Sequence, residues 1–97
     1  MLAIEERGGT LVFAFSGRLD TVDCLEFDAR LAAAAEATSL PVVFDLNGVD
    51  YVASMFLRVC VRTATQVGFE RLRLVNVGPA VKRVLKIAGL DVHLTME

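Results

Sequence analysis

Residues 41–54 read PVVFDLNGVDYVAS, and this stretch decides the fold class of the chain. Its beginning, Pro41 to Leu46, is a continuous apolar run of strand length, which is typical of a central strand in a parallel sheet. Asn47 and Gly48 then turn the chain, and a helix is expected to begin at Ser54. A buried strand that leads through a short turn into a helix is the repeating unit of an α/β sheet.

The helix that follows is predicted from Ser54 to about Val67, because Gly68 provides a stop signal. Apolar residues that recur near the helical period are expected to form its inner stripe, namely Leu57, Val61 and Ala64.

Downstream, residues 71–77 (RLRLVNV) are predicted to form another strand. Gly78 and Pro79 are expected to cap and begin a third helix, and Gly89 is expected to end it. A final edge strand is predicted from Asp91 to Met96. The apolar stripe of the third helix is expected to consist of Val81, Val84, Leu85 and Ala88.

Upstream, two strands are predicted at Leu2 to Glu6 and at Thr10 to Ser16, joined by a hairpin turn at Gly8 and Gly9. Alternate residues of the second strand point to opposite faces, and both sets are apolar. We therefore expect both faces of the sheet to be covered. One set is Leu11, Phe13 and Phe15, and the other is Val12 and Ala14.

A first helix is predicted between these strands and the stretch 41–54. Asp23 is expected to cap it, Glu26 to complete a capping box, and the helix to end near Ala37. Its inner stripe is expected to consist of Cys24, Phe27, Leu31 and Ala34.

The resulting element order is β-β-α-β-α-β-α-β, in which single helices link successive strands. Such links are right-handed crossovers, so the fold class is α/β, with one mixed, mostly parallel sheet and flanking helices. Neither proline begins a Pro/Gly/Ser-rich linker, and no segment repeats another. We therefore expect a single domain over residues 1–97.

The composition excludes several classes of partner and site. The formal net charge is −2, which argues against binding to nucleic acid or to an anionic membrane surface. The apolar run from Leu31 to Ala35 is far shorter than the ~20 residues of a membrane span, so we expect no membrane insertion and a cytoplasmic location. Cys24 and Cys60 form no CxxC pair and are expected to be buried free thiols. Because His93 is the only histidine, we expect no metal site.

Motifs of catalysis are absent from the sequence. The chain has no GxGxxG and no GxxxxGK[ST] loop to hold a nucleotide phosphate. His93 falls in the predicted last strand, and nothing in the sequence places it beside a serine. We therefore expect no enzymatic activity and no cofactor.

Ser54 is the residue whose position favours a regulatory role. Free backbone N–H groups and the positive end of the helix dipole converge at the first turn of a helix. A phosphate on the Ser54 hydroxyl would be stabilised there, and its negative charge would change any surface docked over the helix. The alternative is that Ser54 is only a helix cap, worth ~1 kcal/mol.

Several segments resemble the STAS domains of bacterial anti-sigma factor antagonists, in order and over nearly the whole chain. Gly17 to Asp20 (GRLD) resembles the G-x-[LI]-D that follows the second strand in that family. Residues 42–46 and 49–52 resemble the strand and turn before its phosphorylation site. The most specific segments are GPAVKRVL at 78–85 and AGL at 88–90.

The resemblance implies that Ser54 is phosphorylated by an anti-sigma factor that is also a serine kinase with a histidine-kinase-like ATPase fold. The family motif at this serine is D-S-S-G or D-S-T-G. In this chain Ala53, Met55 and Phe56 replace the aspartate, the second hydroxyl residue and the glycine. Stressosome-type members also have bulky residues after the serine and an Arg-Val pair nearby, which Arg58-Val59 matches.

Two functions are compatible with this resemblance. The first is a regulatory domain that binds such a kinase and is switched by phosphorylation of Ser54, with ATP held by the partner. The alternative is a non-phosphorylated STAS scaffold or accessory subunit, either in a stressosome-like assembly or with an ABC transporter, which forms homo- or hetero-oligomers with other STAS proteins. The residues expected to bind the partner are Asp20, Tyr51, Ala53, Ser54, Met55, Phe56 and Arg58.

Overall fold

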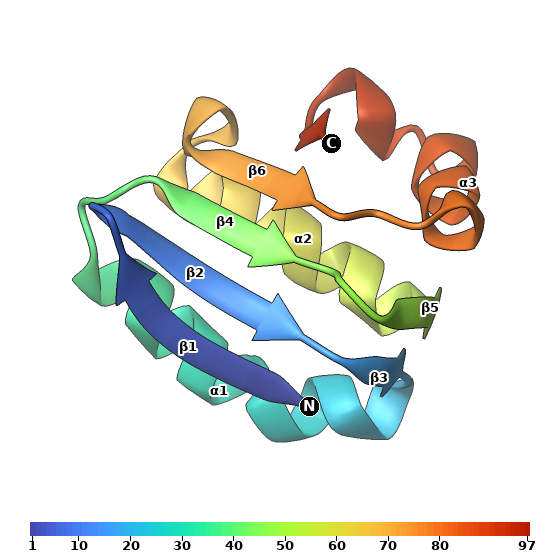
Figure 1. Ribbon diagram of the computed structural model, residues 1–97, viewed down its shortest axis with the longest axis horizontal. Helices are drawn as coiled ribbons and strands as arrows, with labels where there is room; N and C mark the ends of the chain where they lie inside the picture. Colours follow the sequence, from blue (N-terminus) through green and yellow to red (C-terminus); the bar gives the residue numbers. More distant parts are fainter.

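A five-stranded mixed sheet runs through the computed structural model, which describes residues 1–97 (Figure 1). The bounds of its strands and of the helices that connect them are, in chain order, β1 Leu2–Arg7, β2 Thr10–Phe15, α1 Thr21–Ala37, β4 Val42–Asp45, α2 Ser54–Val67, β6 Leu72–Val75, α3 Pro79–Ile87 and β7 Thr95–Met96. The strand order is β1-β2-β4-β6-β7. β1 pairs antiparallel with β2, and all other neighbours pair parallel. The predicted fold class is confirmed.

The hairpin between β1 and β2 turns at Gly8 and Gly9, as predicted. Their φ angles are 58° and 78°, and two successive positive values are typical of the tight turn that matches the twist of hairpin strands. The register pairs Leu2, the first residue of β1, with Phe15, the last residue of β2, so the two strands are paired over their whole length.

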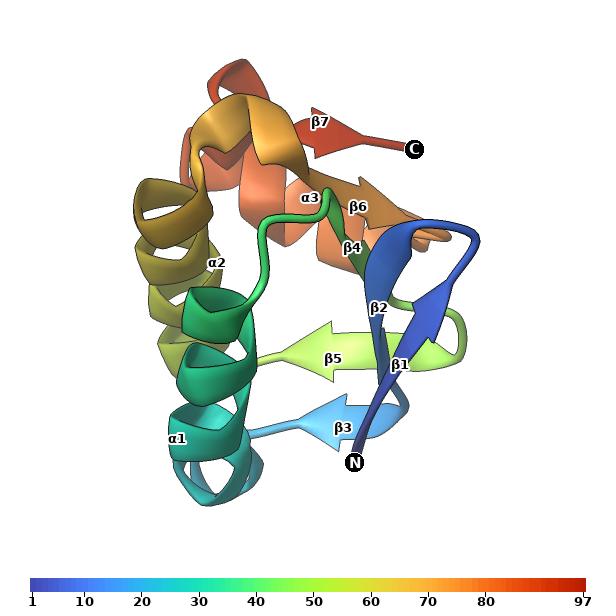
Figure 2. The ribbon, with the colours of Figure 1, turned by 90° about the vertical axis from the view of Figure 1, so that its left-hand side faces the viewer.

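Two further strands, β3 (Gly17–Leu19) and β5 (Val49–Val52), form a separate parallel ladder. They continue from β2 and β4, and Figure 2 shows both pointing toward the helices. The sequence pattern did not predict them, since strands this short show too little alternation and their pairing joins distant parts of the chain.

The helix α1 is capped by Asp20, three residues before the predicted cap, so the prediction for Asp23 is wrong. The backbone N–H of Asp23 donates to the Asp20 carboxylate at 2.9 Å. Capping requires extended backbone geometry, and Asp20 has it, with ψ at 178°. The predicted end at Ala37 is confirmed, while the fourth buried position of this helix is Ala35 instead of Ala34.

The helices α1 and α2 lie on one face of the main sheet, and α3 lies beyond the ends of the strands, against β5 (Figure 2). No helix covers the other face, so the expectation that both faces are covered is wrong. On the open face, Val12 is only 7% exposed, whereas Ala14 and Val43 are half-buried. These small and β-branched side chains stand on neighbouring strands and shield one another from water. None of the helices is both long and apolar enough to span a membrane.

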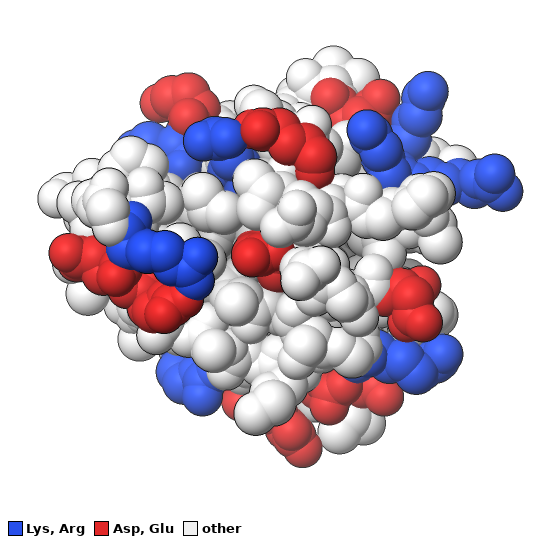
Figure 3. All heavy atoms as spheres, in the orientation of Figure 1, with Lys and Arg blue, Asp and Glu red and all other residues white.

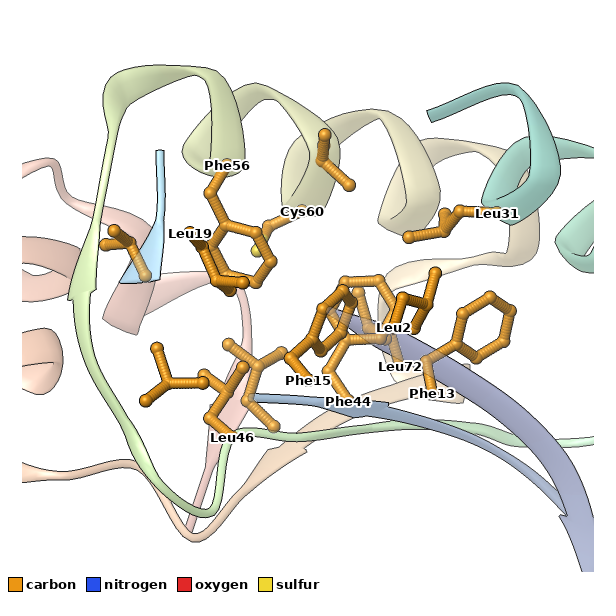
Figure 4. Close-up of a cluster of buried hydrophobic side chains, with 14 of the residues drawn as sticks. Leu2, Phe13, Phe15, Leu19, Leu31, Phe44, Leu46, Phe56, Cys60 and Leu72 are labelled. Carbon is orange, nitrogen blue, oxygen red and sulfur yellow. The ribbon is translucent and has the colours of Figure 1, made fainter. Parts of the chain in front are cut away.

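Phenylalanine rings form the centre of the core, between the sheet and the helices (Figure 4). Phe15 lies 5.1 Å from Phe44, 5.2 Å from Phe56 and 5.4 Å from Phe27, measured between ring centroids. These distances are typical of stabilising aromatic pairs. The cluster therefore joins two strands of the sheet to α1 and α2.

The buried stripe of α2 is rotated by one residue from the predicted one. Phe56 and Cys60 are fully buried, while Leu57 is half-buried and Val61 is 38% exposed. Ala64 is buried as predicted. The sequence allows both stripes, because apolar residues occur in runs at this end of the helix, and the large Phe56 ring decides which stripe packs inward.

The C-terminal segment differs most from its prediction. Only Thr95–Met96 pairs with the sheet as the edge strand β7, and Leu90–Val92 forms a short 3₁₀ helix, η2. His93 is exposed in the connection between them, with its ring 6.0 Å from that of Phe69. In α3, Val81 and Leu85 are buried as predicted, whereas Val84 and Ala88 are exposed.

Candidate functional site

The helices α1, α2 and α3 begin at the edge of the sheet where the parallel strands end. The backbone N–H of Ala53, the residue before α2, donates to the carbonyl oxygen of Leu19 at 2.8 Å, which places it beside the start of α1. Gly78, the residue before α3, lies so that a Cβ atom there would be 3.9 Å from the carbonyl oxygen of Val49. In α/β sheets this edge is where ligands and partners commonly bind.

Ser54 is the first helical residue of α2 and is exposed. The cap is Ala53, with φ −84° and ψ 165°, and its side chain accepts no hydrogen bond. The alternative that Ser54 serves only as the helix cap is therefore wrong. The first turn of α2 has neither a capping side chain nor an acidic residue, and of its N–H groups that of Phe56 donates to the Ala53 carbonyl oxygen at 2.9 Å. The N–H groups of Ser54 and Met55 and the positive end of the helix dipole therefore remain available at Ser54.

Asp20 lies next to this site, through the bond between the Ala53 N–H and the Leu19 carbonyl. Its carboxylate caps α1, and the residue is half-buried. Asp20 thus contributes a fixed negative charge beside the start of α2.

Tyr51 is 40% exposed and contacts Arg18, a residue that sequence reasoning missed. The two pair across the β3–β5 ladder, and the Arg18 guanidinium lies 4.1 Å from the centroid of the Tyr51 ring. A cation held over an aromatic face is an electrostatically favourable contact. The signal that could have identified Arg18 is its position, since each of these two residues stands two places before a helix cap.

The residues that follow Ser54 differ in accessibility. Arg58 is exposed one helical turn after Ser54, and Met55 is half-buried, packed against the core. Phe56 is fully buried and points from α2 toward the sheet (Figure 4), so the expectation that it contacts a partner is wrong. Phe56 belongs to the apolar face of the amphipathic helix α2, and this face packs toward the sheet.

The accessible residues at this edge together form the Ser54 surface, which consists of Arg18, Asp20, Tyr51, Ala53, Ser54, Met55 and Arg58. It combines a hydroxyl at a helix N-terminus with charges of both signs and one exposed aromatic ring. Tyrosine and arginine are enriched among the residues that contribute most to interfaces between proteins. The composition of the Ser54 surface is therefore typical of a protein-binding surface.

The two thiols of the chain are buried, and burial disfavours the thiolate form that would act as a nucleophile. Cys24 and Cys60 are buried and free, as predicted. Burial, with a contribution from Asp23, raises the pKa of the Cys24 thiol to about 11, and burial raises the pKa of Cys60 further. No three His, Cys, Asp or Glu side chains gather in an arrangement that could hold a metal ion.

Comparison with known proteins gives a consistent result. A family model described as STAS domain matches residues 1–97. The chain is 30% identical over 90 residues to BtrV of Bordetella bronchiseptica, which is named as a candidate anti-sigma factor antagonist. The match covers 91% of this chain and 78% of BtrV.

Solved structures show the same architecture. An anti-sigma factor antagonist from Mycobacterium paratuberculosis superposes with a TM-score of 0.87 at 28% identity, over 99% of this chain and 83% of that one. The Bacillus cell fate determinant SpoIIAA in its phosphorylated form superposes with a TM-score of 0.74 at 15% identity, over 100% of this chain and 91% of that one. At 15% identity, the likeness to SpoIIAA shows a shared fold and no more.

Proposed function

The chain belongs to the STAS domain family, and we propose that it acts as an anti-sigma factor antagonist switched by phosphorylation of Ser54. In this proposal the Ser54 surface binds an anti-sigma factor that is also a serine kinase with a histidine-kinase-like ATPase fold. The observation that carries the proposal is the exposed Ser54 at the first turn of a helix that has no capping side chain.

A phosphate on Ser54 fits the local structure. The first turn of α2 offers unpaired N–H groups and the positive end of the helix dipole, and Arg58 lies one turn further along. These groups favour an anion, so the added charge is accommodated without refolding the helix.

The same charge would release a docked partner. A phosphoserine carries about 1.5 to 2 negative charges at pH 7, and the nearby Asp20 carboxylate adds to the negative potential. Burying such a group under a protein interface costs desolvation free energy, and any acidic group of the partner is repelled. The unphosphorylated chain therefore binds, and the phosphorylated chain does not.

The chemistry requires only an acceptor hydroxyl from this chain. The Ser54 oxygen forms a bond to the γ-phosphorus of the partner's ATP, and the bond from that phosphorus to the β–γ bridging oxygen breaks. ADP leaves, and the hydroxyl proton passes to a base of the partner. The name given to BtrV supports the role of anti-sigma factor antagonist. The structure of the Bacillus SpoIIAA in its phosphorylated form shows that a protein of this fold can carry a phosphate.

Affinity capture from a lysate of the native cell tests the proposal. The baits are the wild type, Ser54→Asp and a matched control, Ser39→Asp, which adds the same charge at an exposed position before β4, at the opposite end of the sheet. We expect the wild type and the control to recover an ATPase of the kinase class, identified by mass spectrometry. We expect Ser54→Asp to recover at least about tenfold less, because its charge lies inside the interface.

Equal recovery of one partner by all three baits would contradict the switch. If that partner were another STAS protein or a transporter ATPase, the chain would instead be a scaffold or accessory subunit. The Ser54 surface would then be a constant contact.

A further inference from the structure

A shallow groove of about 420 Å³ runs along α2 on the side that faces the end of α3. Its floor is apolar, formed by Leu57 and Val61 of α2 together with Ala88 and Leu90. Covering the apolar side chains of an open groove with another apolar surface removes them from water, which lowers the free energy. Leu57 and Val61, which were expected to face the core, thus line this α2–α3 groove instead.

The surroundings of the groove are basic. Arg58 and Arg62 line it, Arg62 being paired with Asp28 of α1, and α2 and α3 together carry five basic side chains and no acidic one. Figure 3 shows basic side chains gathered at the corner of the molecule where α3 lies. Because the whole chain has a net charge of −2, this concentration of positive charge is a local feature. An occupant of the groove should therefore be apolar along one stripe and acidic beside it.

The outward face of α1 has that composition. Val22 and Leu25 are 62% and 61% exposed, and the exposed Ala29 and Ala33 continue the same stripe at helical spacing. In total, α1 carries four acidic side chains and one basic side chain, and two of the acidic ones, Glu26 and Glu36, are exposed. This helix thus presents an acidic and apolar surface that no part of its own chain covers.

The two surfaces cannot meet within one molecule. Another side of α1 packs on α2, where Arg62 pairs with Asp28 and the Gln66 side-chain amide donates to the Ala32 carbonyl at 3.1 Å. The α1 and α3 helices consequently lie on opposite sides of α2 (Figure 1). The outward face of α1 and the α2–α3 groove are at opposite edges of the helix layer, where they are available to two different neighbours.

We propose that copies of this chain associate head to tail, with the outward face of α1 of one copy in the α2–α3 groove of the next. Apolar residues are covered on both sides, and a helix with an excess of negative charge meets two helices that carry only positive charge. Different patches meet in such a contact, so each assembly keeps a free groove at one end and a free α1 face at the other, and association continues into chains. This inference does not depend on phosphorylation of Ser54.

Sedimentation velocity of the purified protein from ~10 µM to ~1 mM tests the proposal. We expect the weight-average mass of the wild type to rise steadily with concentration. We expect the rise to shrink as NaCl increases from ~0.05 to ~1 M, because salt screens the charges. Leu25→Lys places a positive charge against the basic groove, and Val61→Glu places a negative charge against the acidic helix. Each is expected to weaken self-association at least about tenfold.

Mixing the two variants gives the decisive result. The Leu25→Lys chain keeps an intact groove, and the Val61→Glu chain keeps an intact α1 face. The mixture is therefore expected to associate with the affinity of the wild type, although each variant alone associates at least about tenfold more weakly. The control is Ala3→Lys, on the open face of the sheet, which should associate like the wild type. Circular dichroism verifies that each variant is folded.

A wild type that stays monomeric to ~1 mM would overturn the proposal and leave the groove to a segment of another protein. Self-association that survives both variants, or that is abolished by Ala3→Lys, would also overturn it, because the contact would then lie outside the helix layer. Failure of the mixture to associate would exclude the head-to-tail geometry.

Discussion

Two helices of this protein begin side by side, and their cap residues differ in a way that explains the site. Asp20 satisfies an N–H of the first turn of α1 with its carboxylate, whereas Ala53 offers α2 no side-chain acceptor. A helix without a cap is less stable but keeps its N-terminal N–H groups available to an incoming anion. At the scale of single residues, the absence of an oxygen at Ala53 is thus as informative as the presence of the Ser54 hydroxyl.

Ala53→Asp is expected to stabilise the protein by about 1 kcal/mol, since the backbone at this position already has the extended geometry of a cap. The free energy of unfolding in urea measures the gain. Ala53→Leu is the matched control, because it fills the same position without an acceptor and should give no gain. Equal effects of the two changes would mean that the first turn of α2 does not lack a hydrogen-bond acceptor.

Phe56→Ala is expected to destabilise the protein by about 3–5 kcal/mol, because it removes a fully buried ring from the aromatic cluster. Met55→Ala, at the neighbouring half-buried position, should cost clearly less. Urea unfolding of both variants gives the comparison. If the two losses were the same, Phe56 could not be the core residue that anchors the start of α2.

The residues of the site were predictable in part. Ser54 could be found because a serine between a buried strand and an amphipathic helix is typical of a helix N-terminus. Arg18 could not, since its role depends on the pairing of β3 with β5, and Phe56 was misassigned because the apolar run at Met55 to Leu57 does not show which residue points inward.

At the scale of elements, the short β3–β5 ladder positions the site. It ends directly at the caps of α1 and α2, and a hydrogen bond links the two segments there. Two helix boundaries were predictable because glycine and proline mark them locally: Gly68 marks the end of α2, and the Gly78-Pro79 pair marks the start of α3. The start of α1 has no such mark, and its cap was predicted three residues too late. The ladder and the two-residue β7 were not, because strands of two to four residues are defined by distant partners and not by their own pattern.

The contact between Arg18 and Tyr51 should couple the two strands energetically. A double-mutant cycle with Arg18→Ala and Tyr51→Ala is expected to give an interaction energy of about 0.5–1 kcal/mol, the range for exposed cation–aromatic contacts. Urea unfolding of the wild type, the two single variants and the double variant measures this interaction energy. Strict additivity of the two single changes would show that the guanidinium does not interact with the ring in solution.

At the scale of the whole molecule, the buried thiols make stability depend on alkaline pH. The pKa of Cys24 is raised from its ordinary 9.0 to about 11, and that of Cys60 is raised as well. Above pH 9 the unfolded chain has lost these protons while the folded chain keeps them, so the folded state binds more protons and stability falls as pH rises. The contribution of Cys24 is fully present below pH 9 and is lost as pH rises through 11.

We expect the free energy of unfolding to decline between pH 9 and pH 11, and to decline less steeply in the double variant Cys24→Ala/Cys60→Ala, which has no thiol to titrate. Urea unfolding at several pH values in this range measures both slopes. Identical slopes would show that the two thiols ionise equally well in the folded and unfolded chain.

The charge of the molecule is unevenly distributed, and this bears on how it meets other proteins. Most charged side chains of α1 are acidic, whereas every charged side chain of α2 and α3 is basic. The net charge of −2 conceals this division, and composition alone therefore predicted which partners to exclude but not where a partner would bind.

The release of the partner on phosphorylation is the most direct test of the proposed switch. The complex captured with the wild type is incubated with Mg·ATP, its dissociation is followed by size-exclusion chromatography, and the chain is mapped by mass spectrometry. We expect one phosphate per chain, on Ser54, together with dissociation, while a complex formed with Ser54→Ala stays intact. A wild-type complex that persists with Ser54 unmodified, or one that dissociates equally in the Ser54→Ala protein, would contradict the phosphorylation switch.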